Sequence, residues 1–490
     1  MLPFWGSLLC WALMPSAQGE ARSNLFLRIN NSQLKTNISD LLTENQVLGG
    51  MKKMPVMGFT SKGKPMIDNL PFVNEGLSSN KGGLDLTLVG DLISGRKLQV
   101  LEKLLRAGGL VIEDAQGPKV TLDILGDSLL QVTLRCKLYL SLQKILWLKI
   151  IKNILIGVRL EQVGNKTQVA IEECYTPPGF LDIEILQQTD SLPVNRLLQL
   201  LSNLLDKVLP SLLQEVVCPT VTTLINSLLE DLLHISLPPI YPGPDDFQYY
   251  VTSTEFTEEA ILMRVLLVTP CGPDQPARKP ESPQPRALPR LAQGSMADLV
   301  FGLEVYNNLL RCLCTRTHVA PVDSVNTTDA DLMKLLTLKE PGLKASNQSV
   351  QSLGLAIRTQ DPPIVHLDGS RATVTQQGSL LLLGPNATSS SSISWQLLSK
   401  AVFFSKNQKL ELQFTAHRAK VTLGPYPAGL KEQEEGLKGL LLALLKRRFL
   451  PQHNKWLREC GLPLPHIKGV SFNQAQMEFS QKYMLLTVPE

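Results

Sequence analysis

The amino-acid sequence predicts an α+β fold of two similar domains, and three observations support this prediction. The chain has 490 residues, more than a single hydrophobic core usually serves. Several long segments alternate apolar and polar residues, as half-buried strands do. Two leucine-rich amphipathic segments, roughly 220 residues apart, are each followed by a Leu-Pro sequence, which indicates an internal duplication. A chance likeness of two leucine-rich helices is the alternative explanation.

The first 19 residues have the features of a secretory signal peptide. An apolar run from Pro3 to Met14 is followed by small residues, with Ala17 and Gly19 where a cleavage site needs them. A buried N-terminal helix is the alternative. No later segment offers about 18 uninterrupted apolar residues. We therefore expect a secreted, extracellular protein with an N-terminal domain over residues 20–240 and a C-terminal domain over residues 241–490.

The N-terminal domain is predicted to begin with a short helix and to continue as a sheet. Leu34, Ile38 and Leu42 share one helical face, and Ser32 is placed to cap the helix. Apolar residues then recur at every second position, most clearly over residues 120–124, 134–142, 151–160 and 167–172. We expect these segments to form long antiparallel strands of one strongly bent sheet.

Two helices should close this domain. The first is predicted over residues 197–217, where apolar side chains form one stripe and Pro210 should kink the helix. The second begins after Cys218, with Pro219 in its first turn. The stripe either fills a closed core or forms the wall of a pocket. The candidates for the pocket wall are Leu197, Leu201, Leu204, Val208 and Leu212.

The C-terminal domain is expected to repeat this plan. Seven prolines lie between residues 270 and 289, in a segment that is either the interdomain linker or a surface loop. We favour a surface loop over residues 269–293, because an alternating strand over residues 261–268 precedes it. Residues 294–313 are predicted to be helical, and strands are expected at 351–357, 364–374, 379–383, 409–414 and 420–423. A leucine-rich helix over residues 435–449 follows. Its candidates for a pocket wall are Leu437, Leu441 and Leu444.

Cysteines and glycosylation sequons fit an exported chain. Seven cysteines remain after Cys10 is lost with the signal peptide, so at least one should stay outside an intramolecular disulfide. The residues alone leave their pairing open. Six Asn-x-Ser/Thr sequons are candidates for glycosylation. They lie at Asn30, Asn37, Asn165, Asn326, Asn347 and Asn386.

Charge and motif content argue against several classes of function. The 48 Lys and Arg nearly balance the 44 Asp and Glu, and no concentrated basic stripe of the kind that binds nucleic acid is present. The six histidines are scattered without metal-ligand spacing. Neither a Gly-x-Ser-x-Gly elbow nor an HExxH sequence occurs. We therefore expect no catalytic residues, no metal and no cofactor.

One segment stands out by its charge. Residues 135–159 contain six Lys or Arg and no Asp or Glu. This run is either the solvated face of a strand or a surface that docks anionic lipid headgroups. The candidates for headgroup docking are Arg135, Lys137, Lys144, Lys149 and Lys152.

The segment from Cys174 to residue 239 resembles a known family. It contains Ile-Glu-Glu-Cys174, then Pro-Gly-Phe-Leu-Asp-Ile over residues 178–183, Leu-Pro at 192–193, a leucine-rich stretch over 204–212, and Val-Cys218-Pro. These features are similar to those of the bactericidal/permeability-increasing (BPI), LBP and PLUNC superfamily. The Gly-Ser-Met-Ala at 294–297 and the Gly-Leu-Pro-Leu-Pro-His-Ile at 461–467 resemble its long, BPI-fold-containing family B members.

This resemblance implies an elongated boomerang of two similar domains. Each would be a bent antiparallel β-barrel with two long helices, and a central β-sheet would join them. It also implies a disulfide between Cys174 and Cys218 and an apolar pocket in each domain that takes acyl chains. One departure from the strongly antibacterial members is charge, because residues 20–240 hold 22 basic and 22 acidic residues.

The resemblance makes a secreted, non-enzymatic lipid-binding protein the first hypothesis. Its partners would be phospholipid or lipopolysaccharide, with transient contact to membrane surfaces and a role in mucosal innate defence. The second hypothesis is an interaction or interface-active protein with collapsed pockets and no bound lipid. Bound lipid in the purified protein distinguishes the two, and turnover of a substrate would favour an enzyme instead.

Overall fold

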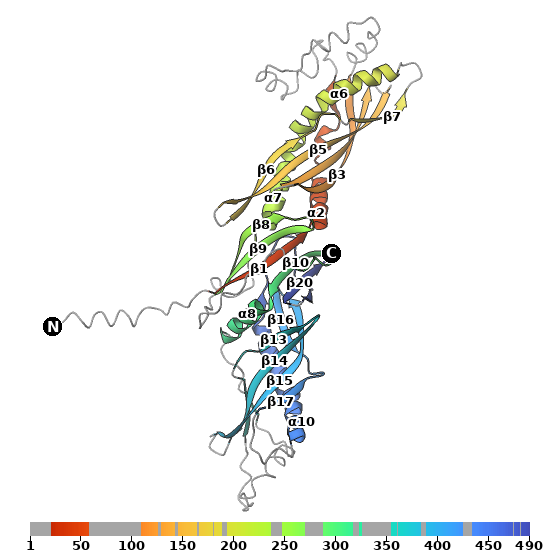
Figure 1. The fold of residues 1–490 in the computed structure, drawn as a ribbon. Coiled ribbons are helices and arrows are strands. Elements are labelled where there is room, and N and C mark those ends of the chain that lie inside the picture. The colour runs from red at the N-terminus through yellow and green to blue at the C-terminus, as the bar shows by residue number, and fades with distance from the viewer. Residues whose placement is uncertain are drawn as a thin grey trace, which may run out of the picture. The chain divides into compact units, whose positions relative to one another are not determined.

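A computed structural model of the chain has a mixed α+β fold with many strands and few helices (Figure 1). The structure describes residues 21–57, 109–125, 129–142, 146–163, 166–179, 181–188, 194–236, 247–269, 288–316, 323–325, 354–359, 361–383, 389–424, 434–473, 475–480 and 482–490. The expected signal peptide and most of the expected proline-rich loop lie outside these residues.

The chain forms two compact units and passes between them more than once. The N-terminal unit comprises residues 29–233 and 253–262, and the C-terminal unit comprises residues 1–28, 234–252 and 263–490. The junction at residue 234 lies close to the expected domain boundary after residue 240. The first strand, however, groups mostly with the C-terminal unit, which a simple division of the sequence does not anticipate.

The N-terminal unit is built on a six-stranded antiparallel sheet of order β2-β3-β4-β5-β6, in which β7 also pairs with β5. Its strands are β2 (Met54–Met57), β3 (Leu110–Leu125), β4 (Leu129–Leu142), β5 (Leu146–Val163), β6 (Lys166–Tyr175) and β7 (Asp182–Gln188). Strict alternation decides which face is covered: Leu134 and Leu138 of β4 are buried, whereas Arg135 and Lys137 between them are exposed. The strands predicted over residues 120–172 lie within β3 to β6.

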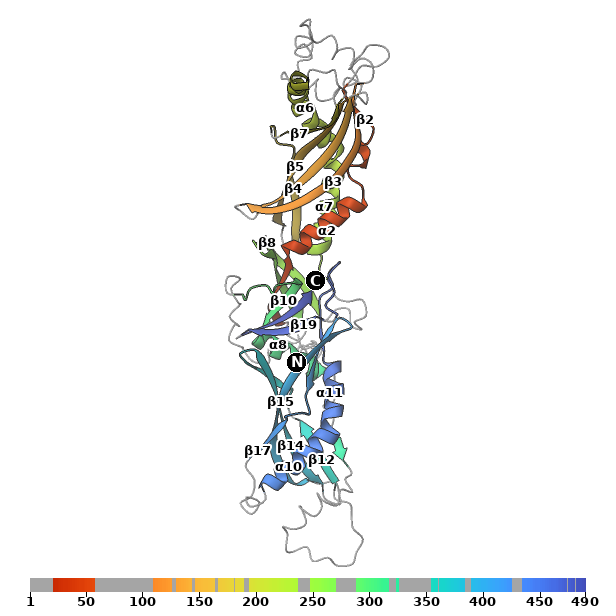
Figure 2. The same cartoon turned by 90° about the vertical axis from the view of Figure 1, so that its right-hand side faces the viewer.

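Three helices pack against this sheet: α2 (Asn31–Glu44), α6 (Val194–Val216) and α7 (Cys218–Leu233), with a 3₁₀ turn, η1 (Gly49–Met51), after α2. Helix α2 contacts β3, and α6 and α7 contact β6 and each other (Figures 1 and 2). The predicted cap of α2 was wrong by two residues. The Asn30 side chain accepts a hydrogen bond from the Ser32 backbone N–H at 2.9 Å, so Asn30 is the N-cap.

No single helix in the described part of the chain is long and apolar enough to cross a membrane. The segments Val208–Val216 and Cys218–Leu233, bent by 44° relative to each other, pass that test only as a pair and only by length and composition.

A second six-stranded sheet has the order β19-β20-β10-β1-β9-β8. Its strands are β1 (Ala21–Asn30), β8 (Gln248–Phe256), β9 (Ala260–Thr269), β10 (Ser295–Gly302), β19 (Gln476–Ser480) and β20 (Tyr483–Pro489). Strand β10 corrects the prediction of a helix from residue 294, because the helix begins only at Leu303. Leu299, Val300 and Phe301 are all buried, and a strand covered on both faces loses the alternation that identifies it in a sequence.

A buried ion pair links two strands of this sheet. The guanidinium of Arg28 on β1 donates to both carboxylate oxygens of Asp298 on β10, with Nε and Oδ1 2.8 Å apart. Burial raises the pKa of Asp298, and the neighbouring Arg28 counteracts that effect. The two side chains are 9% and 1% exposed, so removing either one would leave its partner buried without a counter-charge.

The C-terminal unit also contains an eight-stranded sheet of order β11-β12-β14-β15-β16-β18, with β13 paired to β14 and β17 to β15. Its strands are β11 (Asp323–Val325), β12 (Gly354–Thr359), β13 (Ile364–Asp368), β14 (Arg371–Leu383), β15 (Ser389–Lys406), β16 (Lys409–Phe414), β17 (Lys420–Leu423) and β18 (Leu462–Pro463). The single strand predicted over residues 364–374 is a hairpin instead. It turns at Gly369, whose φ of +59° favours glycine.

The helices of this unit are α8 (Leu303–Arg316), α10 (Glu434–Leu444) and α11 (Leu450–Glu459), with a π-helical turn, η6 (Leu445–Phe449), between the last two. The helix predicted over residues 435–449 therefore continues ten residues further. Helix α10 packs on β17 and α11 on β16. Figure 2 shows α10 and α11 following one another along the blue end of the chain.

The two Leu-Pro segments that suggested a duplication meet in the structure. Ser236, which precedes the first of them, forms an antiparallel bridge with His466, which follows the second. Each backbone N–H donates to the other residue's carbonyl oxygen, at 3.1 Å from Ser236 and 2.8 Å from His466. Reciprocal bonds of this kind are the ordinary pattern of a hydrogen-bonded antiparallel pair.

Candidate functional site

The apolar interior of the N-terminal unit contains part of the predicted pocket wall. Leu201, Val208 and Leu212 of α6 are 1%, 4% and 0% exposed. The side chains of Leu197 and Leu204 lie outside the described part of the structure. The inner face of the sheet is equally apolar along two neighbouring strands. Its buried apolar members on β4 and β5 are Leu130, Val132, Leu134, Cys136, Leu138, Leu140, Leu142, Leu146, Leu148, Ile150, Ile154, Ile156 and Val158.

Lys152 is a charged side chain on that inner face. It is 2% exposed, and its Nζ lies 2.9 Å from Oδ1 of Asp206 on α6 and also donates to the Gly179 carbonyl. The Gly179 backbone N–H in turn donates to the same carboxylate. This placement corrects the prediction that Lys152 docks headgroups, because its ammonium already binds Asp206 inside the unit.

Three of the other candidates for headgroup docking lie on the opposite face of the sheet. Arg135 and Lys137 are exposed, and Lys149 is bonded to Glu184 with Nζ and Oε2 2.6 Å apart. The Glu184 carboxylate raises the pKa of Lys149. Lys144 lies outside the described residues. The cross-strand register adds Lys119, which is exposed and stands directly opposite Arg135. Only this register could have revealed that neighbour.

A disulfide fastens the second helix of the N-terminal unit to the sheet. Cys174 on β6 and Cys218 at the start of α7 are bonded, with Cα atoms 5.9 Å apart, so the pairing implied by the resemblance is present in the structure. Cys312 is also disulfide-bonded. The thiol of Cys136 is buried, and burial raises its pKa to about 12, which makes it unreactive.

The helical layer of the C-terminal unit covers an aromatic cluster that the sequence did not reveal. The His453 ring is fully buried among Phe449, Phe414 and Trp456, with centroid distances of 4.6, 5.3 and 5.3 Å. Burial lowers the pKa of His453 to about 3, so the imidazole is neutral at physiological pH. Neither ring nitrogen has a hydrogen-bond partner among the residues described.

The predicted pocket wall of this layer is also buried where it is described. Leu441 and Leu444 of α10 are 1% and 8% exposed, and the side chain of Leu437 lies outside the described residues. Phe449 continues the same buried face and meets the Trp395 ring at 5.5 Å. The described members of both predicted pocket walls are therefore on the covered sides of their helices, where they can line a cavity or fill a core.

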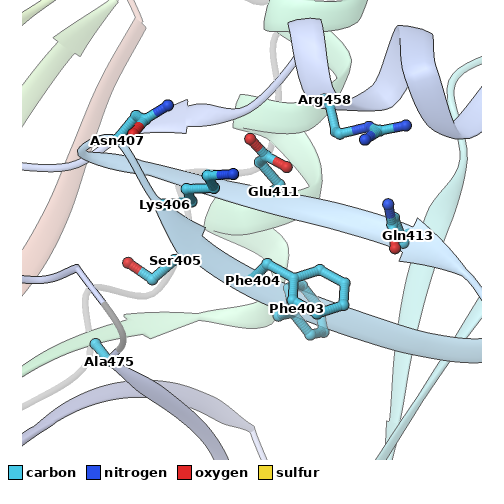
Figure 3. Close-up of a pocket in the computed structure, with 9 residues that line it drawn as sticks. All are labelled: Phe403, Phe404, Ser405, Lys406, Asn407, Glu411, Gln413, Arg458 and Ala475. Atoms are coloured by element: carbon cyan, nitrogen blue, oxygen red, sulfur yellow. The ribbon is translucent and has the colours of Figure 1, made fainter.

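An open groove of about 790 Å³ lies beside the β15–β16 hairpin (Figure 3). Phe404, 45% exposed, stands opposite Glu411 in the strand register, and Arg458 reaches the groove from α11. The groove thus offers a ligand an aromatic surface and charges of both signs. Its lining residues are Phe403, Phe404, Ser405, Lys406, Asn407, Glu411, Gln413, Arg458 and Ala475.

Two of the six sequons lie in the described chain. Asn30 caps α2, and Asn37 lies on α2 with its Oδ1 accepting from Gln33 Nε2 at 2.8 Å. The four other candidates lie outside the described residues, at Asn165, Asn326, Asn347 and Asn386. Within the part of the chain that the structure describes, no group of three or more His, Cys, Asp or Glu side chains could hold a metal ion.

Proteins similar to this chain include BPI fold-containing family members. Residues 98–232 match the LBP / BPI / CETP family, N-terminal domain. The human BPI fold-containing family B member 1 is 24% identical over 341 residues, covering 66% of this chain and 67% of that protein. The mouse BPI fold-containing family B member 3 is 26% identical over an alignment of 517 residues, covering 100% of this chain and 99% of that protein.

Solved structures give a further comparison. The crystal structure of lipopolysaccharide binding protein aligns with 95% of this chain and 98% of that one, at 14% identity and a TM-score of 0.49. The solution structure of latherin aligns with 41% of this chain at 24% identity and a TM-score of 0.27. Residues 98–232 thus match the LBP / BPI / CETP family, and the chain as a whole is similar to BPI fold-containing family B members of the BPI and PLUNC superfamily.

Proposed function

We propose that this chain is an exported, non-enzymatic protein that binds lipid, either phospholipid or lipopolysaccharide, with its acyl chains held in apolar interiors. The observation that carries the proposal is the interior of the N-terminal unit, where the inner faces of β4 and β5 and the covered side of α6 are apolar apart from Lys152. Burying acyl chains gains roughly 0.8 kcal/mol per CH₂ group, so such an interior can hold a lipid without any catalytic group.

The exposed cations on the outer face of the same sheet would meet the headgroup side of a membrane. Arg135, Lys137 and Lys119 form a cluster on β3 and β4, and each basic residue near an anionic surface contributes about 1 kcal/mol. Transient contact with an anionic membrane would bring lipid to the protein. We also propose that the protein acts in mucosal defence and is glycosylated. Its fold would be a boomerang of two barrels joined by a central sheet.

Native mass spectrometry of protein secreted by eukaryotic cells, followed by organic extraction, tests the proposal. One or two phospholipids per chain are expected. Leu212→Trp adds an indole inside the N-terminal unit and should lower the lipid occupancy, whereas Gln214→Trp adds the same group at an exposed position of α6 and should leave the occupancy unchanged.

The proposal would be wrong if the protein still has the mass of the lipid-free chain after incubation with phospholipid vesicles or lipopolysaccharide. The protein would then be a family member with closed cores that acts through its surface. The full burial of Leu212 is compatible with that second function, so occupancy rather than burial decides between the two.

A further inference from the structure

The ends of two helices in the C-terminal unit bring two cysteines together. Cys314 lies in the last turn of α8, and Cys460 follows α11 as its C-cap. The two side chains are 5% and 0% exposed, and the thiol of Cys314 is hydrogen-bonded to that of Cys460. Helix α8 also packs on β18, which begins two residues after Cys460, so the backbones of both segments approach each other here.

The other described cysteines are bonded elsewhere or lie in the N-terminal unit. Cys174 and Cys218 are bonded to each other in the N-terminal unit, and Cys136 is buried in the same unit. Cys312 is itself disulfide-bonded. The thiols of Cys314 and Cys460 are hydrogen-bonded to each other, so each sulfur lies beside the other.

We propose that Cys314 and Cys460 form a disulfide in the exported protein and so fasten the end of α8 to the end of α11. The proposal rests on the proposed export of the chain, because disulfides persist in oxidising compartments. In the reaction the two thiols give up two protons and two electrons as the sulfur–sulfur bond forms. A disulfide oxidant of the glutathione class accepts them and is reduced to two thiols.

The surroundings of the pair determine when the bond can form. The thiolate is the attacking species in disulfide exchange, and burial together with the neighbouring thiol raises the pKa of Cys314. The closed unit therefore contains very little thiolate and admits no oxidant. Cross-linking should be fast while the chain folds and slow after the reduced protein has closed.

A thiol map of the secreted protein tests the proposal. The protein is unfolded without reductant, its thiols are blocked with N-ethylmaleimide, and the digested peptides are identified by mass spectrometry. The peptide containing Cys460 should remain linked to the peptide containing Cys312 and Cys314, with the mass of two hydrogen atoms lost per bond. Cys136 should carry the label and serves as the internal control for an isolated thiol.

Matched variants identify the bonded sulfur. Cys314→Ser should release Cys460 to the label, and Cys136→Ser should leave the link intact. A link that survives Cys314→Ser, or label on both Cys314 and Cys460 in chains whose Cys174–Cys218 bond is intact, would overturn the proposal.

A refolding experiment separates this inference from the proposed export. If no protein reaches the medium, the export proposal fails and the same map is made on protein refolded with a reduced and oxidised glutathione mixture. The Cys314–Cys460 link is again expected, and its absence there overturns the inference. Protein folded in reductant and oxidised afterwards should acquire the link many times more slowly.

Discussion

In the N-terminal unit, an ion pair and a disulfide hold the helices to the sheet. In the C-terminal unit, the helices are instead held by packed aromatic rings. Helix α6 carries Asp206, which binds the buried Lys152, and α7 begins at a cysteine bonded to β6. The layer formed by α10 and α11 instead packs on the cluster around His453. Helices with similar leucine stripes are therefore held to their sheets by different interactions. The two helical layers should unfold under different conditions.

The largest expected loss of stability follows from breaking the ion pair between Lys152 and Asp206. Asp206→Ala leaves the Lys152 ammonium, 1% exposed, without its counter-charge and should lower the free energy of unfolding by about 3 kcal/mol. Glu435→Ala removes one partner of the exposed Glu435–Lys438 pair on α10 and should cost less than about 0.5 kcal/mol. Urea denaturation, with hydrogen exchange of peptides from each unit, measures both. Equal losses for the two variants would contradict the assigned role of Lys152.

Removing the disulfide should have the next largest effect. A double Cys174→Ser, Cys218→Ser variant loses a cross-link between residues 44 positions apart, and such a loss costs about 2–4 kcal/mol. Exchange should accelerate in α7 and β6 and stay unchanged in α10 and α11. The single variant Cys136→Ala keeps the disulfide and serves as the control. Faster exchange in both units would mean that the bond does not act locally.

Acid should destabilise the helical layer of the C-terminal unit more than that of the N-terminal unit. The folded pKa of His453, about 3, lies below its usual value of 6.5, so the unfolded chain binds the proton more readily. The stability contributed by the neutral ring is present above pH 6.5 and falls by about 1.4 kcal/mol for each pH unit below it, until pH approaches 3. His453→Phe should flatten this dependence in the C-terminal unit. An unchanged pH profile in that variant would exclude His453 as the cause.

The smallest change in stability is expected for the exposed cations. Replacing Arg135 and Lys137 by glutamine should leave the unfolding midpoint unchanged, because both side chains are exposed on the outer face of β4. Binding to vesicles that contain phosphatidylserine should weaken by roughly fivefold per residue, since each contributes about 1 kcal/mol. The matched control Lys406→Gln in the C-terminal unit should bind as before. Equal binding by all three proteins would rule out this docking face.

Sequence patterns predicted the elements whose two faces differ. Strands β3 to β6 and helices α6 and α7 have one buried and one exposed side, so their periodicity was readable. Strand β10 is covered on both sides and was mistaken for a helix. Strand β15 begins with four consecutive serines over residues 389–392 rather than an apolar run, and its pairing with β14 became visible only in the structure.

The candidate site shows a similar division. Lys152 was assigned to the solvent face by its charge, although it shares its parity along β5 with the buried Leu148, Ile150 and Ile154. That parity was a signal in the sequence and was overlooked. Lys119 and His453 carried no such signal, because the first depends on strand register and the second on the packing of α11 against β16.

The bridge between Ser236 and His466 has a consequence for how this chain could diverge. Its two hydrogen bonds join backbone atoms only, so they constrain the path of the chain and not the identity of either side chain. Either side chain can therefore be replaced without loss of these bonds. Only a residue without a backbone N–H, which is proline, would remove one of them.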